Sequence, residues 1–142
     1  MEANTIEVLL VEDAIDDYEI IRNVLDDNHI NYHHVKDGQE AIRYIFSSTE
    51  STNGIKKLYL ILLDLKLPKL DGLEVLKRIR SNPKTHNIPV VILSSTDDLR
   101  EIAQAYDLGA SSFAIKPIEF EKFVKILNAI FNYWIQVNER SD

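Results

Sequence analysis

The sequence predicts an α/β fold, a doubly wound (βα)5 domain whose five-stranded parallel sheet carries helices on both faces. Short apolar segments alternate five times with amphipathic segments along the 142 residues. One apolar segment, LYLILL at residues 58–63, has no polar face and is followed by turn residues. Such a run is typical of a strand buried on both sides in a parallel sheet. Short connections between alternating elements require right-handed crossovers.

The elements follow from the hydrophobic pattern and from the turn residues between them. We expect strands at residues 6–11, 30–35, 58–64, 88–93 and 112–115. We expect helices at residues 14–27, 40–46, 73–80, 97–108 and 119–137. The second strand is less apolar and should lie near an edge of the sheet, Gly109 should cap the fourth helix, and residues 47–57 should form a polar loop.

Composition argues against several kinds of partner and of chemical site. The net charge of -7 argues against a nucleic-acid partner, because a phosphate backbone attracts basic surfaces. The absence of cysteine excludes disulfides, a thiolate nucleophile and a cysteine-based zinc site. No stretch approaches the roughly 18 apolar residues of a membrane span, and the N-terminus lacks an export signal. We therefore expect residues 1–142 to form one cytoplasmic domain without an output domain or a membrane partner.

Polar residues follow four of the five predicted strands. Glu12 and Asp13 follow the first, Asp64 ends the third, Ser94 follows the fourth and Lys116 follows the fifth. The carboxyl ends of parallel strands lie at one edge of the sheet, where open α/β folds bind their ligands. We therefore expect acids, a hydroxyl and one lysine to converge there.

This set of side chains predicts a phosphoryl site. Close carboxylates repel one another by roughly 4 kcal/mol per pair at an effective dielectric near 20, a cost that a divalent cation removes. Oxygen ligands without cysteine or histidine favour Mg²⁺ over Zn²⁺. Asp64 is then the candidate nucleophile, Lys116 the fixed cation and Ser94 a hydroxyl donor to the phosphoryl group.

Each of these residues also has an ordinary structural explanation. Glu12 and Asp13 could cap the first helix, and Asp64, Ser94 and Lys116 could be turn or surface residues. Their convergence at one edge favours the functional interpretation. The four histidines fall outside the strand ends, so we predict that they are surface residues: His29, His33, His34 and His86.

Together these motifs resemble the receiver domains of two-component response regulators. The sequence is most similar to the single-domain regulators that partner cyanobacterial phytochrome kinases, in its polar insert before the third strand, its Asn82-Pro83 turn and its Tyr133-Trp134 pair. The resemblance implies a flavodoxin-like fold. It also implies a signalling domain, not an enzyme in the usual sense, that takes a phosphoryl group from the phosphohistidine of a sensor histidine kinase onto Asp64.

The resemblance further implies roles for individual residues. Mg²⁺ would be held by Asp13, Asp64 and the Lys66 carbonyl, with Glu12 acting directly or through water. Ser94 would be the switch hydroxyl, Lys116 would bind the phosphate, and the bond between Lys116 and Pro117 would be cis. The sequence has Phe113 at the aromatic switch position where many relatives have Tyr, so that side chain can rotate but cannot donate a hydroxyl hydrogen bond. When Ser94 and Phe113 move, they should reshape the face made by the fourth helix, the fifth strand and the fifth helix.

Two other functions use similar features. A phosphatase or phosphotransferase of the haloacid-dehalogenase type also uses an aspartate nucleophile at a strand end, but it needs a second aspartate two residues later, where this chain has Lys66. Lys66 also places a cation near the predicted phosphoryl group. A flavodoxin-like nucleotide binder would need a glycine-rich phosphate loop, and the four glycines are too dispersed to form one.

The final helix carries two apolar stripes, although a helix on one side of a sheet needs only one. The first stripe should face the core and contains Phe120, Phe123, Val124, Leu127, Phe131 and Trp134. The second stripe contains Ile126, Ile130, Tyr133 and Val137. We expect it to form a homodimer interface within the face made by the fourth helix, the fifth strand and the fifth helix, unless it packs under the C-terminal tail.

Overall fold

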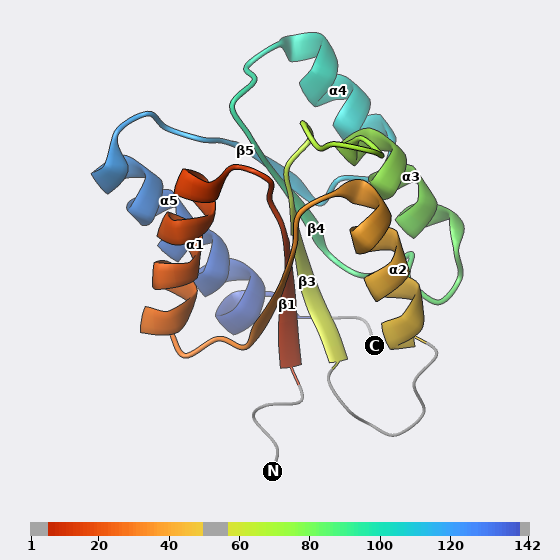
Figure 1. The fold of residues 1–142 in the computed structure, drawn as a ribbon, viewed down its shortest axis with the longest axis horizontal. Helices are drawn as coiled ribbons and strands as arrows, with labels where there is room; N and C mark the ends of the chain where they lie inside the picture. Colours follow the sequence, from red (N-terminus) through yellow and green to blue (C-terminus); the bar gives the residue numbers. More distant parts are fainter. Residues whose placement is uncertain (1–5, 50–56, 140–142) are drawn as a thin grey trace.

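The computed structural model describes residues 6–49 and 57–139 and contains one parallel sheet with strand order β2-β1-β3-β4-β5 (Figure 1). The predicted fold class is therefore confirmed. The less apolar second strand lies at an edge, as expected, and β3 lies at the centre. The strands are β1 (Ile6–Val11), β2 (Tyr32–Val35), β3 (Lys57–Leu63), β4 (Val90–Ser94) and β5 (Ser112–Ile115).

Helices cover both faces of the sheet. The helices α1 and α5 lie on one face, and α2, α3 and α4 lie on the other (Figure 1). Their bounds are α1 (Ile15–Asp27), α2 (Gly38–Thr49), α3 (Gly72–Ser81), α4 (Leu99–Asp107) and α5 (Phe120–Phe131), followed by a π-helical segment, η2 (Asn132–Val137). None of the described helices is long and apolar enough to cross a lipid bilayer.

The central strand β3 explains why the fold needs two layers of helices. Ile61 and Leu63 enter the core under α2, α3 and α4, whereas Leu60 and Leu62 enter the core under α1 and α5. All four side chains are at most 1% exposed. Because a fully buried aliphatic side chain contributes about 1.5–3 kcal/mol, this strand alone stabilises the domain substantially and holds its carboxyl end in place.

Capping residues fix the start of α3 and both ends of α4. The Asp71 carboxylate accepts a hydrogen bond from the Glu74 N–H at 3.1 Å and caps α3. The Asp98 carboxylate caps α4 by accepting from the Arg100 N–H at 2.9 Å. Gly109 follows the last residues of α4 with φ of 107°, a left-handed conformation that glycine adopts without strain. The predicted glycine cap is confirmed.

Two segments differ most from the prediction, and β2 and β4 begin two residues later than predicted, at Tyr32 and Val90. The sequence predicts a loop over residues 47–57, whereas α2 continues to Thr49 and β3 begins at Lys57; residues 50–56 lie outside the described part. The sequence also predicts one α-helix over residues 119–137, whereas α5 ends at Phe131 and η2 follows. A π-helix has a longer turn than an α-helix, so the spacing of side chains changes at that point.

The two predicted stripes of the last helix are correct only in part. Trp134 and Ile135 pack against the core under α1 and α5, and so does Ile130 from the stripe predicted to be free. Tyr133 and Val137 are exposed, as that stripe requires. Phe120 is predicted to face the core but is 61% exposed, because it stands at the first residue of α5, beyond the covered part of the sheet.

Candidate functional site

The predicted residues converge at the carboxyl edge of the sheet. Glu12 follows β1, Asp64 follows β3, Ser94 ends β4 and Lys116 follows β5. Glu12, Asp64 and Ser94 are buried, at 2%, 7% and 0% exposure. Buried polar groups at one edge of a parallel sheet are where the fold predicts a ligand site.

Lys116 lies at the centre of this site. Its ammonium nitrogen lies 3.0 Å from Glu12 Oε1, 2.9 Å from Asp17 Oδ2 and 3.1 Å from Asp64 Oδ2. Its side chain is only 6% exposed. An ammonium has three hydrogens to donate, so these three carboxylates use its full capacity.

The acids at the site carry more negative charge than the single lysine can neutralise. Burial raises the pKa of Glu12 to about 7 and the negative charge of Asp64 adds to the effect, while Lys116 and the Ala14 N–H oppose it. Burial alone would lower the pKa of Lys116, but the charge of Glu12, the hydrogen bond to Asp17 and the charge of Asp64 raise it above its ordinary value. Lys116 therefore stays charged, and its single positive charge leaves excess negative charge on the acids.

Backbone geometry fixes the Asp64 carboxylate. Its Oδ1 accepts a hydrogen bond from the Lys66 N–H at 3.2 Å, while its Oδ2 faces Lys116. The start of α3 lies close behind it, since a Cβ at Gly72 would come within 2.5 Å of the Asp64 carbonyl oxygen. Only glycine permits this approach, which ties the acceptor strand to the next helix.

The Lys66 side chain extends toward α4. It is 70% exposed, and its ammonium lies 4.0 Å from the Glu101 carboxylate. An exposed pair at this distance contributes little to stability. The side chain that the sequence places near the acceptor is therefore turned outward in this structure, while its backbone remains bonded to Asp64.

The two predicted switch residues lie on the neighbouring strands. Ser94 Oγ accepts a hydrogen bond from the Thr96 N–H at 3.3 Å. Phe113 on β5 is half-buried against the core under α2, α3 and α4, and its N–H donates to the Tyr106 hydroxyl at 3.1 Å. Both residues therefore connect the site edge to α4 and β5.

The donor chemistry of the edge fits Mg²⁺. Within residues 6–49 and 57–139, no group of three or more acidic or histidine side chains is arranged to hold a metal ion. The Lys116 ammonium lies between the carboxylates of Glu12 and Asp64, and Asp13 is exposed. Mg²⁺ is usually held by one or two carboxylates and keeps several waters, so oxygen ligands beside excess negative charge suit it.

One residue-level expectation is wrong. The resemblance implies a cis bond between Lys116 and Pro117, but the described chain contains no cis peptide bond. The trans form of such a bond is favoured by about 0.5–1 kcal/mol unless the surrounding structure imposes the other isomer. The Lys116 N–H, which belongs to the preceding peptide, donates to the Ser94 carbonyl at 2.8 Å and extends the pairing of β4 with β5.

Two contacts of the site were not predicted. Asp17 in α1 is not among the predicted site residues, yet it contacts Lys116. His34 is expected at the surface, yet its Nε2 lies 2.8 Å from the Glu12 carbonyl oxygen and must carry a proton to donate there. His34 also stacks on Tyr18, with ring centroids 4.0 Å apart. His29, His33 and His86 are exposed, as predicted.

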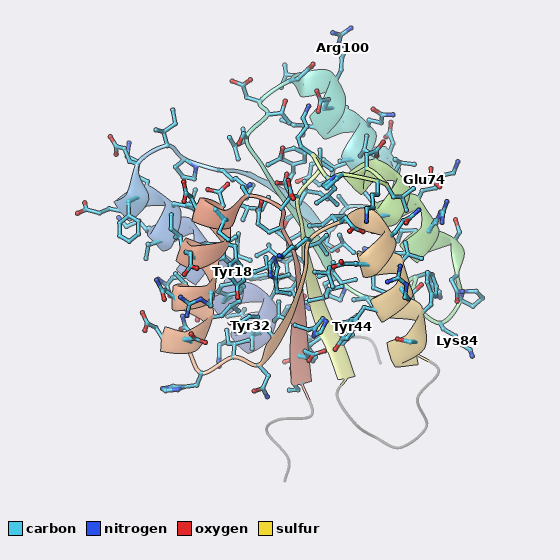
Figure 2. All side chains as sticks on the ribbon, viewed as in Figure 1. Tyr18, Tyr32, Tyr44, Glu74, Lys84 and Arg100 are labelled. Carbon is cyan, nitrogen blue, oxygen red and sulfur yellow. The ribbon has the colours of Figure 1, made fainter. Side chains whose placement is uncertain are left out.

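The His34 contact belongs to an aromatic group on the α1 side of the sheet. Figure 2 shows Tyr18 and Tyr32 on that side and Tyr44 on the side of α2. Burial and a hydrogen bond with Tyr18 raise the pKa of Tyr32 to about 12. Tyr32 therefore stays neutral, and the aromatic group packs α1 against β2.

A parallel α/β domain with a buried aspartate after its central strand, next to a second acid and a lysine, has the architecture of a signal receiver. The chain belongs to the response regulator receiver domain family, whose model matches residues 8–128.

Within that family the chain is similar to phytochrome response regulators. It is 32% identical to response regulator Rcp1 of Synechocystis sp. over 131 residues, which cover 91% of this chain and 88% of that protein. The crystal structure of the phosphorylated cyanobacterial phytochrome response regulator RcpA matches with a TM-score of 0.88 and 33% identity, over 96% of this chain and 98% of that one.

A third comparison concerns a metal. The Mn²⁺-bound form of Rcp1 matches with a TM-score of 0.82 and 29% identity, covering 96% of this chain and 99% of that one. The predicted resemblance to receivers of phytochrome pathways is therefore confirmed. The comparisons give no support to the phosphatase alternative.

Proposed function

We propose that this protein is a cytoplasmic two-component response regulator whose Asp64 accepts a phosphoryl group from the phosphohistidine of a sensor histidine kinase. The observation that carries the proposal is the pairing of the Asp64 and Glu12 carboxylates with the buried Lys116 ammonium at about 3 Å. Membership of the receiver family supports the same class of function. The similarity to RcpA and Rcp1 favours a phytochrome as the kinase.

The transfer breaks one bond and forms another. An Asp64 carboxylate oxygen attacks the phosphorus atom, the phosphorus–nitrogen bond breaks, and its electron pair returns to the imidazole of the kinase. The product on Asp64 is an acyl phosphate. Hydrolysis then gives back the carboxylate and releases inorganic phosphate with a proton from water.

The residues around Asp64 have distinct tasks in this reaction. Lys116 directs positive charge at the oxygens of the transferred group. The Lys66 N–H orients the Asp64 carboxylate through Oδ1. We infer that Asp13, Asp64 and the Lys66 carbonyl hold Mg²⁺, with Glu12 binding it directly or through water. When bound, that ion neutralises charge that develops on the phosphoryl oxygens.

Phosphorylation should change a surface through Ser94 and Phe113. Ser94 Oγ already accepts a hydrogen bond at the site edge and can donate its own hydrogen to a phosphoryl oxygen. Phe113 can follow by rotating inward from its half-buried position. Because Phe113 is bonded to Tyr106 of α4 through its backbone, this movement would reach the face made by α4, β5 and α5.

Asp64→Ala should abolish the labelling of the protein by acetyl phosphate in the presence of Mg²⁺, because it removes the acceptor oxygen. Intact-mass measurement detects the added phosphoryl group. Asp97→Asn is a suitable control, since Asp97 is an exposed acid that follows β4 at the same edge. It should retain labelling. Undiminished labelling of Asp64→Ala would contradict the proposal, and steady multiple turnover of an aryl phosphate by the wild type would favour the phosphatase alternative.

A further inference from the structure

Asp17 differs from the other two carboxylates that contact Lys116. Glu12 and Asp64 follow strands, whereas Asp17 lies in the first turn of α1 and its side chain is 30% exposed. Its contact with Lys116 is the shortest of the three, at 2.9 Å. The contact joins α1 to the connection between β5 and α5, 99 residues apart in the chain.

The three carboxylates that contact Lys116 should change in different ways when Asp64 is phosphorylated. This inference rests on the proposed function, which makes Asp64 the acceptor. Asp64 loses its negative charge on becoming an acyl phosphate, so the hydrogen donated to it becomes available to a phosphoryl oxygen. Under the proposed function Glu12 would serve the metal, directly or through water. Asp17 receives neither group, so it alone keeps its charge and its contact with the ammonium.

The geometry shows that Asp17 does not draw Lys116 away from the acceptor. The ammonium contacts Asp17 Oδ2 at 2.9 Å and Asp64 Oδ2 at 3.1 Å at the same time. If Asp17 drew the lysine away from the acceptor, the ammonium would contact Asp17 and would no longer contact Asp64. A lysine side chain has four rotatable bonds and loses considerable entropy when it is fixed, so a charged partner that fixes it near Asp64 favours the productive position.

We propose that Asp17 is a positioning residue, which anchors the Lys116 ammonium beside Asp64 so that one of its hydrogens faces the incoming phosphoryl group. Asp17 acts through Lys116 and does not touch the phosphoryl group. Its influence should therefore appear in the binding of the phosphoryl group and not in the binding of the metal.

Asp16 provides a matched control. It is an exposed acid in the same first turn of α1, so Asp16→Asn removes the same charge from the same helix end. We would measure the affinity of each variant for Mg²⁺ alone, and then for beryllofluoride, a phosphoryl analogue, at saturating Mg²⁺. Urea unfolding checks that each variant is folded.

Asp17→Asn should weaken beryllofluoride binding by about fivefold to tenfold, as expected for a partly exposed charge-assisted contact. Its Mg²⁺ affinity should match that of Asp16→Asn. Asp17→Glu should restore most of the beryllofluoride affinity. In a Lys116→Met background, Asp17→Asn should cause no further loss, because the residue through which Asp17 acts is gone.

Three outcomes would overturn the inference: equal loss in Asp16→Asn and Asp17→Asn, tighter beryllofluoride binding in Asp17→Asn, or an undiminished effect of Asp17→Asn without Lys116. Failure of the proposed function is distinguishable, because it would appear in the wild type as no labelling of Asp64 by acetyl phosphate and would overturn both statements.

Discussion

Glu12 is a buried acid of the candidate site whose charged form is disfavoured by its surroundings. Its carboxyl group is 2% exposed, and burial with the charge of Asp64 raises its pKa to about 7 from an ordinary value of 4.5. Since the folded state binds this proton more tightly than the unfolded state does, the contribution of Glu12 to stability falls as the pH rises from about 4.5 to about 7.

Glu12→Gln should therefore stabilise the metal-free protein at pH 8 and have little effect near pH 5. The gain at pH 8 should be at most about 3.5 kcal/mol, since the pKa of Glu12 moves from 4.5 to about 7 and one pKa unit corresponds to about 1.4 kcal/mol. Urea unfolding with a chelator at both pH values measures it. For Asp16→Asn, an exposed acid, the difference from the wild type should vary little with pH. A Glu12→Gln protein that is less stable at pH 8 than at pH 5, relative to the wild type, would contradict the assignment.

The sequence predicts the residues of the site that follow strands, because parallel topology alone brings strand ends together. Asp64, Glu12 and Lys116 are found in this way. Asp17 and His34 are missed, because their contacts depend on the rotation of α1 and on side-chain reach. The only available signal for Asp17 was its position one helical turn after Asp13.

At the scale of elements, Arg80 ties the end of α3 to the far edge of the sheet. Its guanidinium donates to the carbonyls of Gly109, His86 and Ile88 at 2.7–3.0 Å and to Ser111 Oγ at 3.2 Å. Burial lowers its pKa from the ordinary value. Arg80 therefore joins α3, the segment before β4 and the turn between α4 and β5.

Arg80→Ala should lower the free energy of unfolding by about 2–4 kcal/mol, because it leaves several carbonyls without their charged donor. Arg78→Ala is the matched control, since Arg78 on the same helix is half-exposed and pairs with Glu74 at 3.1 Å. That change should cost at most about 0.5 kcal/mol. Urea unfolding of both variants provides the comparison, and equal losses would show that Arg80 does not hold these elements together.

The same scale shows where the pattern of the sequence is insufficient. The presence of all five strands and their sequence along the chain follow from apolar runs and turn residues. The π-helical turns of η2 do not, because the same apolar residues fit a continuous α-helix. The longer turn brings Ile135 into the core and leaves Tyr133 exposed. Beyond Phe131 the predicted stripes hold for Trp134, which packs on the core, and for the exposed Tyr133 and Val137, whereas the misassigned Phe120 and Ile130 lie in α5.

At the scale of the whole molecule, the exposed apolar side chains favour association with a second copy. Tyr106 on α4, Ile115 on β5, and Tyr133 and Val137 on η2 are each 42–55% exposed. Tyr106 and Ile115 lie on the face made by α4, β5 and α5, whereas Tyr133 and Val137 belong to the stripe for which the sequence predicts a homodimer interface. A stable interface buries about 1,200–2,000 Å² in total, so Tyr133 and Val137 cannot form it alone and the other elements of the face must contribute.

We expect a reversible dimer that becomes more stable when beryllofluoride and Mg²⁺ occupy the site, because the switch residues Ser94 and Phe113 adjoin this face. Replacing both Tyr133 and Val137 by Ser should weaken dimerisation by about tenfold or more through lost apolar burial. Ile15→Ser removes a still more exposed apolar side chain at the start of α1 and should leave dimerisation unchanged. Sedimentation velocity over a range of concentrations measures the association. A wild-type protein that stays monomeric at high concentration, with and without beryllofluoride, would show that the exposed residues of η2 do not form a dimer interface.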